Sequence, residues 1–476
     1  MARVLLSAAH KSSGKTTLSV GLAAALATRG LAVQTFKKGP DYIDPMWLAH
    51  ASGRPCYNLD FNTHTNGEIR NTAAVREAAA DFALIESNKG LHDGVDLEGK
   101  DSSAALAKLL EAPVILVIDT LGMTRGIAPL ILGYQAFDRE THIAGIVLNK
   151  VGTVRQQDKM LQALERYTNI PVIGAVPRNK DFAITERHLG LMTPSETPEL
   201  RAKIARLRTA VEDGVDVDRL LAIGRAAPEL QASPSFPVRT CAPRTIRIAV
   251  ARDSAFGFYY AGDLEAFERA GAKLCFFDAL SDSRLPEADG LFIGGGFPET
   301  QAAGLEANAG LRADIARRVR AGLPTYAECG GMMYLARSIQ WKGASHQMVG
   351  VIPADAVMYE RPQGRGLVLL EETEDAPWPL AEGASKARIP AHEFHYAALE
   401  NLSGLHRFAY RLARGVGMGG GHDGIVIGNL LASFSHLRSS PRNPWVERFV
   451  ASVRLHRERR AQAATICADT PHELHL

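Results

Sequence analysis

The sequence predicts an α/β protein built from two parallel-sheet domains, the first of them a phosphate-loop (P-loop) domain. Three observations carry this prediction. Short apolar runs alternate with helix-favouring segments in both halves of the chain, an early run leads into a Gly-Lys-Thr motif at residues 14–16, and a later run, residues 323–327, leads into Cys329. Near-continuous runs of Val, Ile and Leu separated by helices are typical of parallel strands with both faces covered.

Length and composition narrow the class of protein. At 476 residues the chain is too long for a single core, and with 46% hydrophobic and 22% charged residues it has the composition of a globular protein. The net charge of +2 gives no reason to expect binding to nucleic acid or a membrane, no apolar run approaches 18 residues, and the N-terminus lacks a signal pattern, so a cytoplasmic protein is expected. Five scattered cysteines without a Cys-x-x-Cys pair argue against a disulfide framework or a zinc site.

The first domain is expected to be a parallel sheet. Its apolar runs are short, rich in Val, Ile and Leu, and separated by segments long enough for a crossover helix. In such sheets the ligand lies at the carboxyl ends of the strands. The predicted strands are residues 4–9, 31–36, 82–86, 114–119, 143–149 and 172–176.

The segment from residue 4 to residue 28 predicts a site for the phosphates of a nucleotide. A strand, a tight loop and a helix N-terminus place several backbone N–H groups and the positive end of a helix dipole around one point, which suits a phosphate. Lys15 would reach the β- and γ-phosphates, and the Thr16 hydroxyl would hold Mg²⁺. The glycine that usually opens such a loop is missing, so an ordinary strand–turn–helix unit is the alternative.

Acidic residues follow two strands beside this loop. Asp41 and Asp44 lie in Gly-Pro-Asp-Tyr-Ile-Asp-Pro directly after the second strand, and Glu86 ends the third. Mg²⁺ takes one or two protein carboxylates beside nucleotide phosphates, so Thr16, Asp41 and Glu86 are a candidate set, although the two aspartates could also be simple turn formers. Asp119 is either a metal residue or a helix N-cap. The strand ends also carry Lys37, Lys38 and Asn149.

A helical connector and a linker are expected between the domains. Thr197 and Pro198 have the chemistry of an N-cap and a first helical residue, a polar helical stretch follows to about residue 227, and residues 228–245 contain four prolines. A second alternating block begins at residue 246, and residues 349–434 hold strands without long helices, which favours antiparallel additions to its sheet. The expected boundaries are 1–194 for the first domain, 195–245 for the connector and linker, 246–452 for the second domain and 453–476 for a basic, polar tail.

Cys329 has the setting of a catalytic nucleophile. It follows an apolar strand and precedes small residues at a helix start, where the helix dipole favours the thiolate, although a buried structural cysteine is the alternative. A second glycine loop, residues 294–296, ends another strand and can turn N–H groups toward an oxyanion. For the base, His436 follows a late strand, whereas His392 and His395 lie on either side of a glutamate. The oxyanion candidates are Gly295, Gly296 and Gly330.

Several motifs taken together resemble one known family. They are the phosphate loop, Lys-x-Gly-Pro-Asp-Tyr-Ile-Asp-Pro, Glu86 with Asp93-Gly94, Gly-Gly-Gly-Phe-Pro-Glu, Glu-Cys-Gly-Gly-Met-Met-Tyr-Leu, His-Glu-Phe-His and the late Ser-His-Leu. Over about residues 3–450 the chain resembles the cobyrinate a,c-diamide synthase family of glutamine amidotransferases. The resemblance implies a dethiobiotin-synthetase-like ATPase domain joined to a class I glutamine-amidotransferase-like domain, with ATP and Mg²⁺ as cofactors.

The resemblance also implies roles for individual residues. Asn149 would contact the adenine, Cys329 would be the glutaminase nucleophile, and His436 would be the base that raises its reactivity. ATP would convert a substrate carboxylate to an acyl phosphate, and ammonia from glutamine would then displace the phosphate. The other implied residues are Gly14, Lys15, Thr16 and Thr17 on phosphate and Mg²⁺, Asp41 and Glu86 on the metal, and Tyr42, Asp44 and Asp93 near the reacting carboxylate.

The loop after Glu86 departs from the family pattern. Family members have Glu-Gly-x-x-Gly-Leu-(Tyr/Phe)-Asp-Gly, whereas this chain has Ser87, Asn88, Lys89 and His92. The loop before Gly14 also departs, with His10-Lys11-Ser12-Ser13 in place of glycines, and both loops lie where the substrate and the nucleotide should meet. Lys89 is therefore a candidate partner for a peripheral carboxylate of a polyanionic macrocycle.

The expected function is ATP- and glutamine-dependent amidation of the a and c acetate side chains of a cobyrinate-type tetrapyrrole. The expected partners are glutamine and a tetrapyrrole polycarboxylate, without nucleic acid or membrane, and a homodimer is left open. Three alternatives remain. They are the same chemistry on sirohydrochlorin or sirohaem, amidation of the remaining side chains of cobyric acid, and a ParA-like ATPase switch with a degenerate amidotransferase domain.

Overall fold

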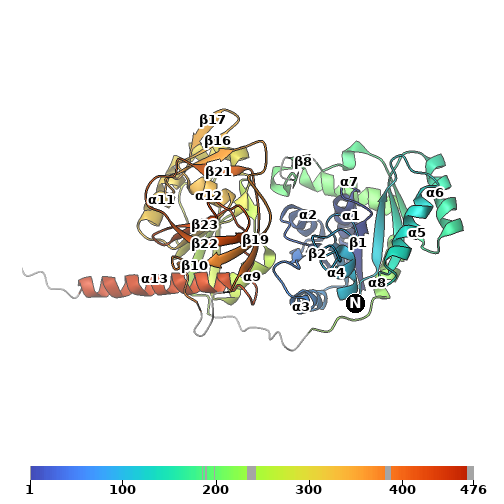
Figure 1. The fold of residues 1–476 in the computed structure, drawn as a ribbon, viewed down its shortest axis with the longest axis horizontal. Helices are drawn as coiled ribbons and strands as arrows, with labels where there is room; N and C mark the ends of the chain where they lie inside the picture. Colours follow the sequence, from blue (N-terminus) through green and yellow to red (C-terminus); the bar gives the residue numbers. More distant parts are fainter. Residues whose placement is uncertain are drawn as a thin grey trace, which may run out of the picture. The chain divides into compact units, whose positions relative to one another are not determined.

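The computed structural model divides the chain into two compact units, Met1–Pro237 and Val238–Leu476 (Figure 1). The structure describes residues 2–184, 186–187, 190–197, 199–232, 243–380 and 387–468. Part of the expected linker, residues 233–242, lies outside the described residues, and the expected domain boundaries stay predictions.

The first unit holds a seven-stranded sheet in which every neighbouring pair of strands is parallel. The strand order is β3-β2-β4-β1-β5-β6-β7, so β1 lies at the centre and its carboxyl end is flanked by those of β4 and β5. All six predicted strands are confirmed, and the short β3 was missed. The strands are β1 (Ala2–Ala8), β2 (Val33–Lys38), β3 (Tyr57–Leu59), β4 (Phe82–Glu86), β5 (Val114–Asp119), β6 (Ile143–Val151) and β7 (Val172–Pro177).

Helices connect these strands, and two further helices complete the unit. Helices α7 and α8, which the sequence analysis assigned to a connector, pack on α1, β7 and β1 of this unit. The helices are α1 (Lys15–Thr28), α2 (Ile43–Ser52), α3 (Asn66–Glu77), α4 (Ser103–Leu109), α5 (Ile127–Phe137), α6 (Val154–Tyr167), α7 (Leu200–Gly214) and α8 (Val217–Arg225). The minor elements are η1 (Lys180–Phe182), β8 (Glu186–Arg187), β9 (Gly190–Leu191) and η2 (Pro194–Glu196).

The predicted start of the connector helix was wrong. Helix α7 begins at Leu200, and its N-cap is Glu199 in the left-handed region with φ 54°. The Thr197 hydroxyl donates instead to the carbonyl oxygen of Thr193, which keeps it in the preceding turn. Pro198, the expected first helical residue, lies outside the described residues.

Gly21 of α1 sets the distance between α1 and α7. A Cβ on this residue would lie 2.5 Å from the carbonyl oxygen of Leu207 and 2.6 Å from a methyl group of Val211. We therefore expect Gly21→Ala to lower the free energy of unfolding by about 1–3 kcal/mol, because backbone atoms of α7 must move. Urea unfolding would measure it. The matched control is Gly133→Ala in α5, where a Cβ meets no atom within 4 Å and the change should stabilise the helix by up to ~1 kcal/mol; equal effects at both sites would contradict the prediction.

The second unit is built on a nine-stranded mixed sheet of order β12-β10-β13-β15-β24-β23-β22-β19-β20. The first five strands are parallel and the remaining pairings are antiparallel, as the change of rhythm after residue 349 predicted. Its strands are β10 (Ile246–Ala251), β12 (Ala272–Phe277), β13 (Gly290–Ile293), β15 (Thr325–Glu328), β19 (Gly364–Glu372), β20 (Ile389–His395), β22 (Arg407–Arg414), β23 (His422–Ile427) and β24 (Leu430–Ser433). Two smaller sheets pair β11 (Phe256–Phe258) with β14 (Gly295–Gly296), and join β16 (Ser338–Trp341), β17 (Ala344–Gln347), β18 (Asp355–Met358) and β21 (Ala397–Glu400).

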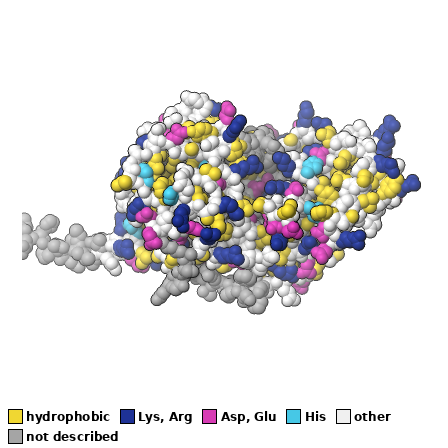
Figure 2. Space-filling view, in the orientation of Figure 1, with side chains coloured by type: hydrophobic (Ala, Val, Ile, Leu, Met, Phe, Trp, Pro, Cys, Tyr) yellow, Lys and Arg dark blue, Asp and Glu magenta, His cyan; other side chains and the backbone are white. Residues whose placement is uncertain are grey.

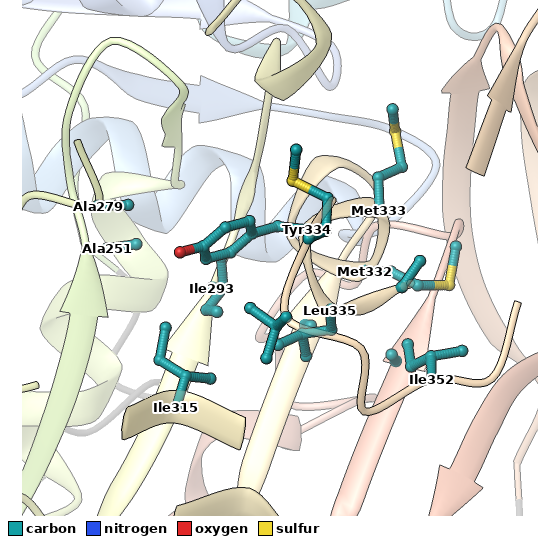
Figure 3. Close-up of a cluster of buried hydrophobic side chains, with 14 of the residues drawn as sticks. Ala251, Ala279, Ile293, Ile315, Met332, Met333, Tyr334, Leu335 and Ile352 are labelled. Atoms are coloured by element: carbon teal, nitrogen blue, oxygen red, sulfur yellow. The ribbon is translucent and has the colours of Figure 1, made fainter. Parts of the chain in front are cut away.

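The short helix that follows Cys329 is buried along its whole length. Met332, Met333, Tyr334 and Leu335 of this helix lie in an apolar cluster that also holds Ile293 at the end of β13 (Figure 3). This packing gives the cysteine a rigid support. The helices of the unit are α9 (Ala261–Arg269), η3 (Pro298–Gln301), α10 (Ala302–Ala307), α11 (Ala309–Arg320), α12 (Gly330–Leu335) and α13 (Trp445–Ala468).

The expected C-terminal tail is largely helix. Helix α13 runs from Trp445 to Ala468, Val453 is fully buried, and Arg454 donates to the carbonyl oxygen of Ala270, so this helix continues the second unit beyond residue 453. None of the helices in the described part of the chain has the length and apolar content that a membrane crossing needs. Figure 2 shows basic and acidic side chains mixed over the visible face, in keeping with the small net charge.

Candidate active sites

The loop between β1 and α1 has the backbone conformation of a phosphate site. Gly14 is the N-cap of α1 in the left-handed region with φ 89°, and a Cβ there would collide with the side-chain nitrogen of Asn149. Asn149 at the end of β6 donates from Nδ2 to the carbonyl oxygen of Ser13 at 2.8 Å. The Ser13 hydroxyl in turn donates to the carbonyl oxygen of His10 at 2.8 Å, so the loop is held without the missing glycines.

A cavity of about 600 Å³ opens at this loop. Its lining holds polar side chains of the loop, among them Lys15, Thr16 and Thr17, and also apolar side chains. A nucleotide likewise combines charged phosphates with a flat base. The apolar lining residues include Val176, Pro177, Phe182, Ile184, Leu207 and Val211.

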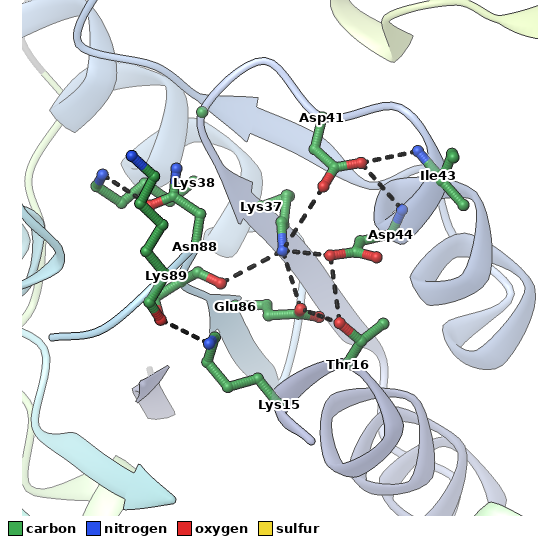
Figure 4. A network of polar contacts seen from close by, with 12 residues as sticks. Lys15, Thr16, Lys37, Lys38, Asp41, Ile43, Asp44, Glu86, Asn88 and Lys89 are labelled. Atoms are coloured by element: carbon green, nitrogen blue, oxygen red, sulfur yellow. Dashed lines mark hydrogen bonds and ion pairs between the residues drawn. The ribbon is translucent and has the colours of Figure 1, made fainter. Parts of the chain in front are cut away.

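Lys37 lies at the centre of the acidic cluster beside the loop (Figure 4). Its ammonium group forms an ion pair with Asp44. It also donates hydrogen bonds to Oε1 of Glu86 at 2.9 Å and to the carbonyl oxygen of Ser87 at 3.3 Å. The Thr16 hydroxyl donates to the same oxygen of Glu86 at 2.7 Å and lies 3.2 Å from Asp44. The sequence analysis noted Lys37 at a strand end but assigned it no role.

The cluster contains more carboxylate charge than Lys37 alone can balance. Burial lowers the pKa of Lys37, but Asp44 and Glu86 raise it well above its usual value. Burial alone would raise the pKa of Asp44, but the charge of Lys37 outweighs it and lowers this pKa. For Glu86 burial is the larger effect, and its pKa is raised. Burial and the neighbouring Asp44 also raise the pKa of Asp41 to about 7. The site therefore favours a further cation.

The side chains present fit Mg²⁺ bound together with nucleotide phosphates. Oε2 of Glu86 is buried and has no hydrogen-bond partner, which leaves an oxygen ligand available. Within the described residues, no three acidic, histidine or cysteine side chains converge closely enough to hold a metal by themselves. Mg²⁺ commonly takes only one or two carboxylates and completes its shell with phosphate and water. Asp44 contacts Thr16, whereas Asp41 caps α2 by accepting from the backbone N–H groups of Ile43 and Asp44.

Lys15 and Lys89 are linked at the mouth of the cavity. The Lys15 ammonium donates to the backbone carbonyl oxygen of Lys89 at 2.6 Å, and Lys89 has a positive φ of 46°. Burial, with the nearby charge of Lys37, lowers the pKa of Lys15 to about 8. Two other predicted residues, Tyr42 and Asp93, do not line the cavity: Tyr42 is buried, and Asp93 accepts from the backbone N–H of Gly90 at 2.9 Å.

Asp119 is not the helix N-cap that the sequence left open, and its role near the metal stays a prediction. Its carboxylate pairs with Lys150 at 2.7 Å and accepts from the backbone N–H of Leu121 at 3.0 Å. No helix starts there, because α5 begins only at Ile127. Asp119 therefore connects the loop after β5 to the end of β6.

In the second unit, Cys329 sits at the turn from β15 into α12. Its φ of 46° is a strained value for a residue with a side chain, and its backbone N–H donates to the carbonyl oxygen of Ser433 at 2.7 Å. A Cβ on Gly330 would lie 3.0 Å from the backbone nitrogen of Gly296, and one on Gly331 would collide with the carbonyl oxygen of Ile293. Only small residues therefore allow this turn to approach the glycine loop.

His436 contacts Cys329, and Glu328 supports it from the other side. Nδ1 of His436 lies 3.4 Å from Oε2 of Glu328, whose other oxygen accepts from the Tyr326 hydroxyl at 2.6 Å and from the backbone N–H of Leu437 at 2.9 Å. Burial would lower the pKa of His436, but its hydrogen bonds to Cys329 and Glu328 raise it to about 10. The arrangement favours the imidazolium form of His436 beside the Cys329 sulfur. Glu328 was missed as a site residue, although it stands next to Cys329 in the sequence.

The two other histidines considered for the base, His392 and His395, have different neighbours. His392 stacks on His436, with ring centroids 4.9 Å apart and planes inclined by 15°, and burial lowers its pKa well below the usual value. His395 stacks instead on Phe434 and pairs with the carbonyl oxygen of Ala397. A Cβ on Gly295 would lie 2.7 Å from Cε1 of His436, which brings the glycine loop to the same place.

Comparison with known proteins identifies both units. Residues 7–191 match the model of the CobQ/CobB/MinD/ParA nucleotide binding domain, and residues 247–444 match that of the CobB/CobQ-like glutamine amidotransferase domain. A cobyrinate a,c-diamide synthase of Magnetococcus marinus is 42% identical over 93% of this chain and 95% of its own, and one of Methanosarcina barkeri is 39% identical over 96% and 97%. The chain belongs to the cobyrinate a,c-diamide synthase family. It is therefore an ATP-dependent carbon–nitrogen ligase with glutamine as amido donor.

The family assignment confirms the fold class predicted from the sequence, a P-loop domain joined to a glutamine-amidotransferase-like α/β domain. A solved glutamine amidotransferase is also similar, with 19% identity and a TM-score of 0.30 over 44% of this chain and 95% of that chain. The nucleotide-binding model covers the phosphate loop and the acidic cluster, and the amidotransferase model covers Cys329 and His436. The roles of the individual site residues remain predictions.

The support of His436 by Glu328 predicts a pH effect. The raised pKa means that the imidazolium persists until the pH rises through about 10, so glutamine hydrolysis should hold its rate below that pH and decline above it. Glu328→Gln removes the negative charge and should move this decline to lower pH, while the amide oxygen still accepts from Tyr326 and Leu437. Profiles of kcat/KM for glutamine against pH would show the shift. Glu306→Gln, which alters a partly exposed pair with His346, is the control; an identical alkaline limb in wild type and Glu328→Gln would contradict the prediction.

Proposed function

We propose that this enzyme uses Mg·ATP and glutamine to convert the a and c acetate carboxylates of cobyrinate to amides. The observation that carries the proposal is the presence, in one chain, of a nucleotide cavity ending in a carboxylate–lysine cluster and a Cys–His–Glu arrangement. Relatives named cobyrinate a,c-diamide synthase that match more than nine-tenths of the chain support the choice of substrate.

The amidotransferase unit supplies ammonia. The Cys329 thiolate attacks the side-chain amide carbon of glutamine, and backbone N–H groups of Gly295, Gly296 and Gly330 stabilise the oxyanion. The His436 imidazolium donates its proton to the departing amine, so ammonia leaves and a glutamyl thioester remains. Water then hydrolyses the thioester, with His436 accepting a proton from it, and glutamate is released.

The P-loop unit activates the acceptor. Thr16, Glu86 and Asp44 or Asp41 would hold Mg²⁺, which when bound neutralises phosphate charge. Lys15 and Lys37 stabilise negative charge on the transferring phosphoryl group, Thr17 and Gly14 form the phosphate loop, and Asn149 borders the nucleoside. A carboxylate is a poor electrophile, so the substrate is converted to an acyl phosphate, from which ammonia displaces phosphate. Tyr42 and Asp93 would act on the acceptor through the loops that they hold.

A second candidate substrate comes from the acceptor loop. Lys89 is exposed and lines the cavity at the place where this chain departs from the family pattern. A different distribution of carboxylates around the macrocycle would suit such a change. Sirohydrochlorin or sirohaem, amidated by the same chemistry, is therefore the alternative substrate.

The experiment is a comparison of substrates with the purified enzyme. Cobyrinate, sirohydrochlorin and sirohaem are each incubated with Mg·ATP and glutamine, and mass spectrometry of the tetrapyrrole is combined with assays of ADP and glutamate. We expect two successive replacements of a hydroxyl by an amino group on cobyrinate, each with one ADP and one glutamate. Release of neither ADP nor glutamate with any of the three would exclude the proposed function.

A further inference from the structure

Lys38, Asn88 and Lys89 gather beside the acidic cluster, and the reaction described above leaves two of them without a role. Lys38 ends β2 next to Lys37, and Asn88 and Lys89 follow the end of β4. Figure 4 shows the three side chains together on one side of Lys37, Asp44 and Glu86. Asn88 and Lys89 line the same cavity as the phosphate loop, whereas Lys38 lies buried behind them.

The contact with Lys38 determines which way the Asn88 amide faces. The Lys38 ammonium donates to Oδ1 of Asn88 at 2.9 Å, and a lysine has no acceptor, so the amide oxygen must point to Lys38 and the NH₂ group away from it. Nδ2 of Asn88 would lie 3.0 Å from a Cβ on Gly39, a residue with φ 82°, so the absence of a side chain there leaves room for it. The Ser103 hydroxyl holds the backbone by donating to the carbonyl oxygen of Asn88 at 3.2 Å. Asn88 therefore presents donors.

The Lys89 ammonium is a second donor at the same place. The structure records no hydrogen bond or ion pair for it among the described residues, although the Lys89 carbonyl is tied to Lys15. Burial, with the charges of Lys89 and Lys37, lowers the pKa of Lys38 to about 8, against the opposing charges of Asp101 and Asp60. Neighbouring positive groups repel each other in the free enzyme, and an anion between them relieves the repulsion.

We propose that Lys89 and the Asn88 amide bind a carboxylate of the substrate other than the one being amidated, and that Lys38 is a positioning residue that acts through Asn88. The inference rests on the proposed function, because it needs a substrate with several carboxylates. A donor-only pair selects an acceptor-only, anionic group, which a carboxylate is. The backbone carbonyl oxygen of Lys89 accepts a hydrogen bond from Lys15, the P-loop lysine. The subsite therefore lies next to the reaction centre, and it determines which carboxylate of the macrocycle reaches that centre.

The first test separates binding of the tetrapyrrole from binding of the nucleotide. We expect Lys89→Met to raise KM for cobyrinate at least about tenfold with KM for Mg·ATP and for glutamine unchanged, since one charged hydrogen bond contributes about that much, and Lys89→Arg to recover most of the loss. The control is Lys100→Met, which removes an exposed charge farther along the same loop. If Lys89→Met instead weakens binding of a non-hydrolysable Mg·ATP analogue in the absence of tetrapyrrole, and leaves KM for cobyrinate unchanged, Lys89 binds nucleotide phosphate and the proposal fails.

The second test asks whether Lys38 acts through Asn88. Lys38→Met, Asn88→Ala and the double variant form a cycle in which each single change should raise KM for cobyrinate without a matching fall in kcat. We expect the double variant to be no worse than Asn88→Ala, because Lys38 has no remaining partner to position. If the two single changes raise KM independently, so that their factors multiply in the double variant, Lys38 does not act through Asn88 and the positioning role is overturned.

A third measurement distinguishes failure of the subsite from failure of the proposed function. Equilibrium binding of cobyrinate, followed by its visible absorbance, requires no turnover. Suppose that the wild-type enzyme binds cobyrinate without amidating it, and that Lys89→Met binds it at least about tenfold more weakly. This result would exclude the proposed function and retain the subsite. Amidation by the wild-type enzyme with equal binding by Lys89→Met would overturn the subsite alone.

Discussion

Cys329→Ser should reduce glutamine-dependent amidation by about 10³-fold or more and leave amidation with added ammonium chloride close to the wild-type rate. In the proposed mechanism the thiolate is the nucleophile that attacks the glutamine amide, and a serine hydroxyl is a far weaker nucleophile. The proposed acyl phosphate forms in the other unit and would react with ammonia from any source. Steady-state assays with glutamine and with ammonium chloride would measure the two rates.

The matched control for this change is Cys275→Ser. Cys275 is partly exposed on β12, and its thiol has no part in the proposed reaction. The variant should keep both activities. Equal loss of the glutamine- and ammonia-dependent rates in Cys329→Ser would show a structural effect, and an unchanged glutamine-dependent rate would exclude Cys329 as the nucleophile.

Lys37→Met should lower the free energy of unfolding of the first unit by about 3–5 kcal/mol at neutral pH, because it leaves buried carboxylates without their cation. Lys37 pairs with Asp44 and Glu86 inside the unit, where water cannot replace it. The change should also abolish amidation with both glutamine and ammonia, since the acceptor site is disrupted, while glutamine hydrolysis at Cys329 remains. Urea unfolding and the two assays would measure these effects.

The pH dependence of Lys37→Met gives the prediction a second readout. Lys37 lowers the pKa of Asp44, so its stabilisation is present above the unfolded pKa of an aspartate, about 4, and is lost as the pH falls through the lower folded value. The difference between wild type and variant should therefore shrink on acidification. The control is Lys108→Met, in which an exposed lysine also loses two carboxylate partners, Asp138 and Glu140, with an expected cost of at most about 1 kcal/mol. Equal costs at both lysines would contradict the argument.

The strands were predictable because their signal is local. Continuous apolar runs such as Phe82–Glu86 and Val114–Asp119 coincide with β4 and β5, since a strand buried on both faces needs apolar residues at every position. The three-residue β3 is too short to show such a run. The start of α7 was misjudged because Thr197 is drawn into the preceding turn by a hydrogen bond to Thr193, a contact that capping preferences do not report.

The active-site residues were predictable where a motif places them, and their partners were not. The Gly-Lys-Thr motif and the small residues around Cys329 are visible as patterns of neighbouring residues in the sequence. The partner of Lys37 is 49 residues away in Glu86, and the partner of Glu328 is 108 residues away in His436. Such pairs depend on which strands become neighbours.

Two α/β units, the phosphate loop after the first strand, the position of Cys329 before a helix, and the family were all readable from the amino-acid sequence. The three-dimensional fold was needed to place Lys37 at the centre of the carboxylate cluster, Glu328 against His436, and Lys38 against the amide oxygen of Asn88. The reason is physical. Backbone conformation is set by residues close in sequence, whereas the charge and hydrogen-bond partner of a buried side chain are set by whichever strand and loop pack beside it.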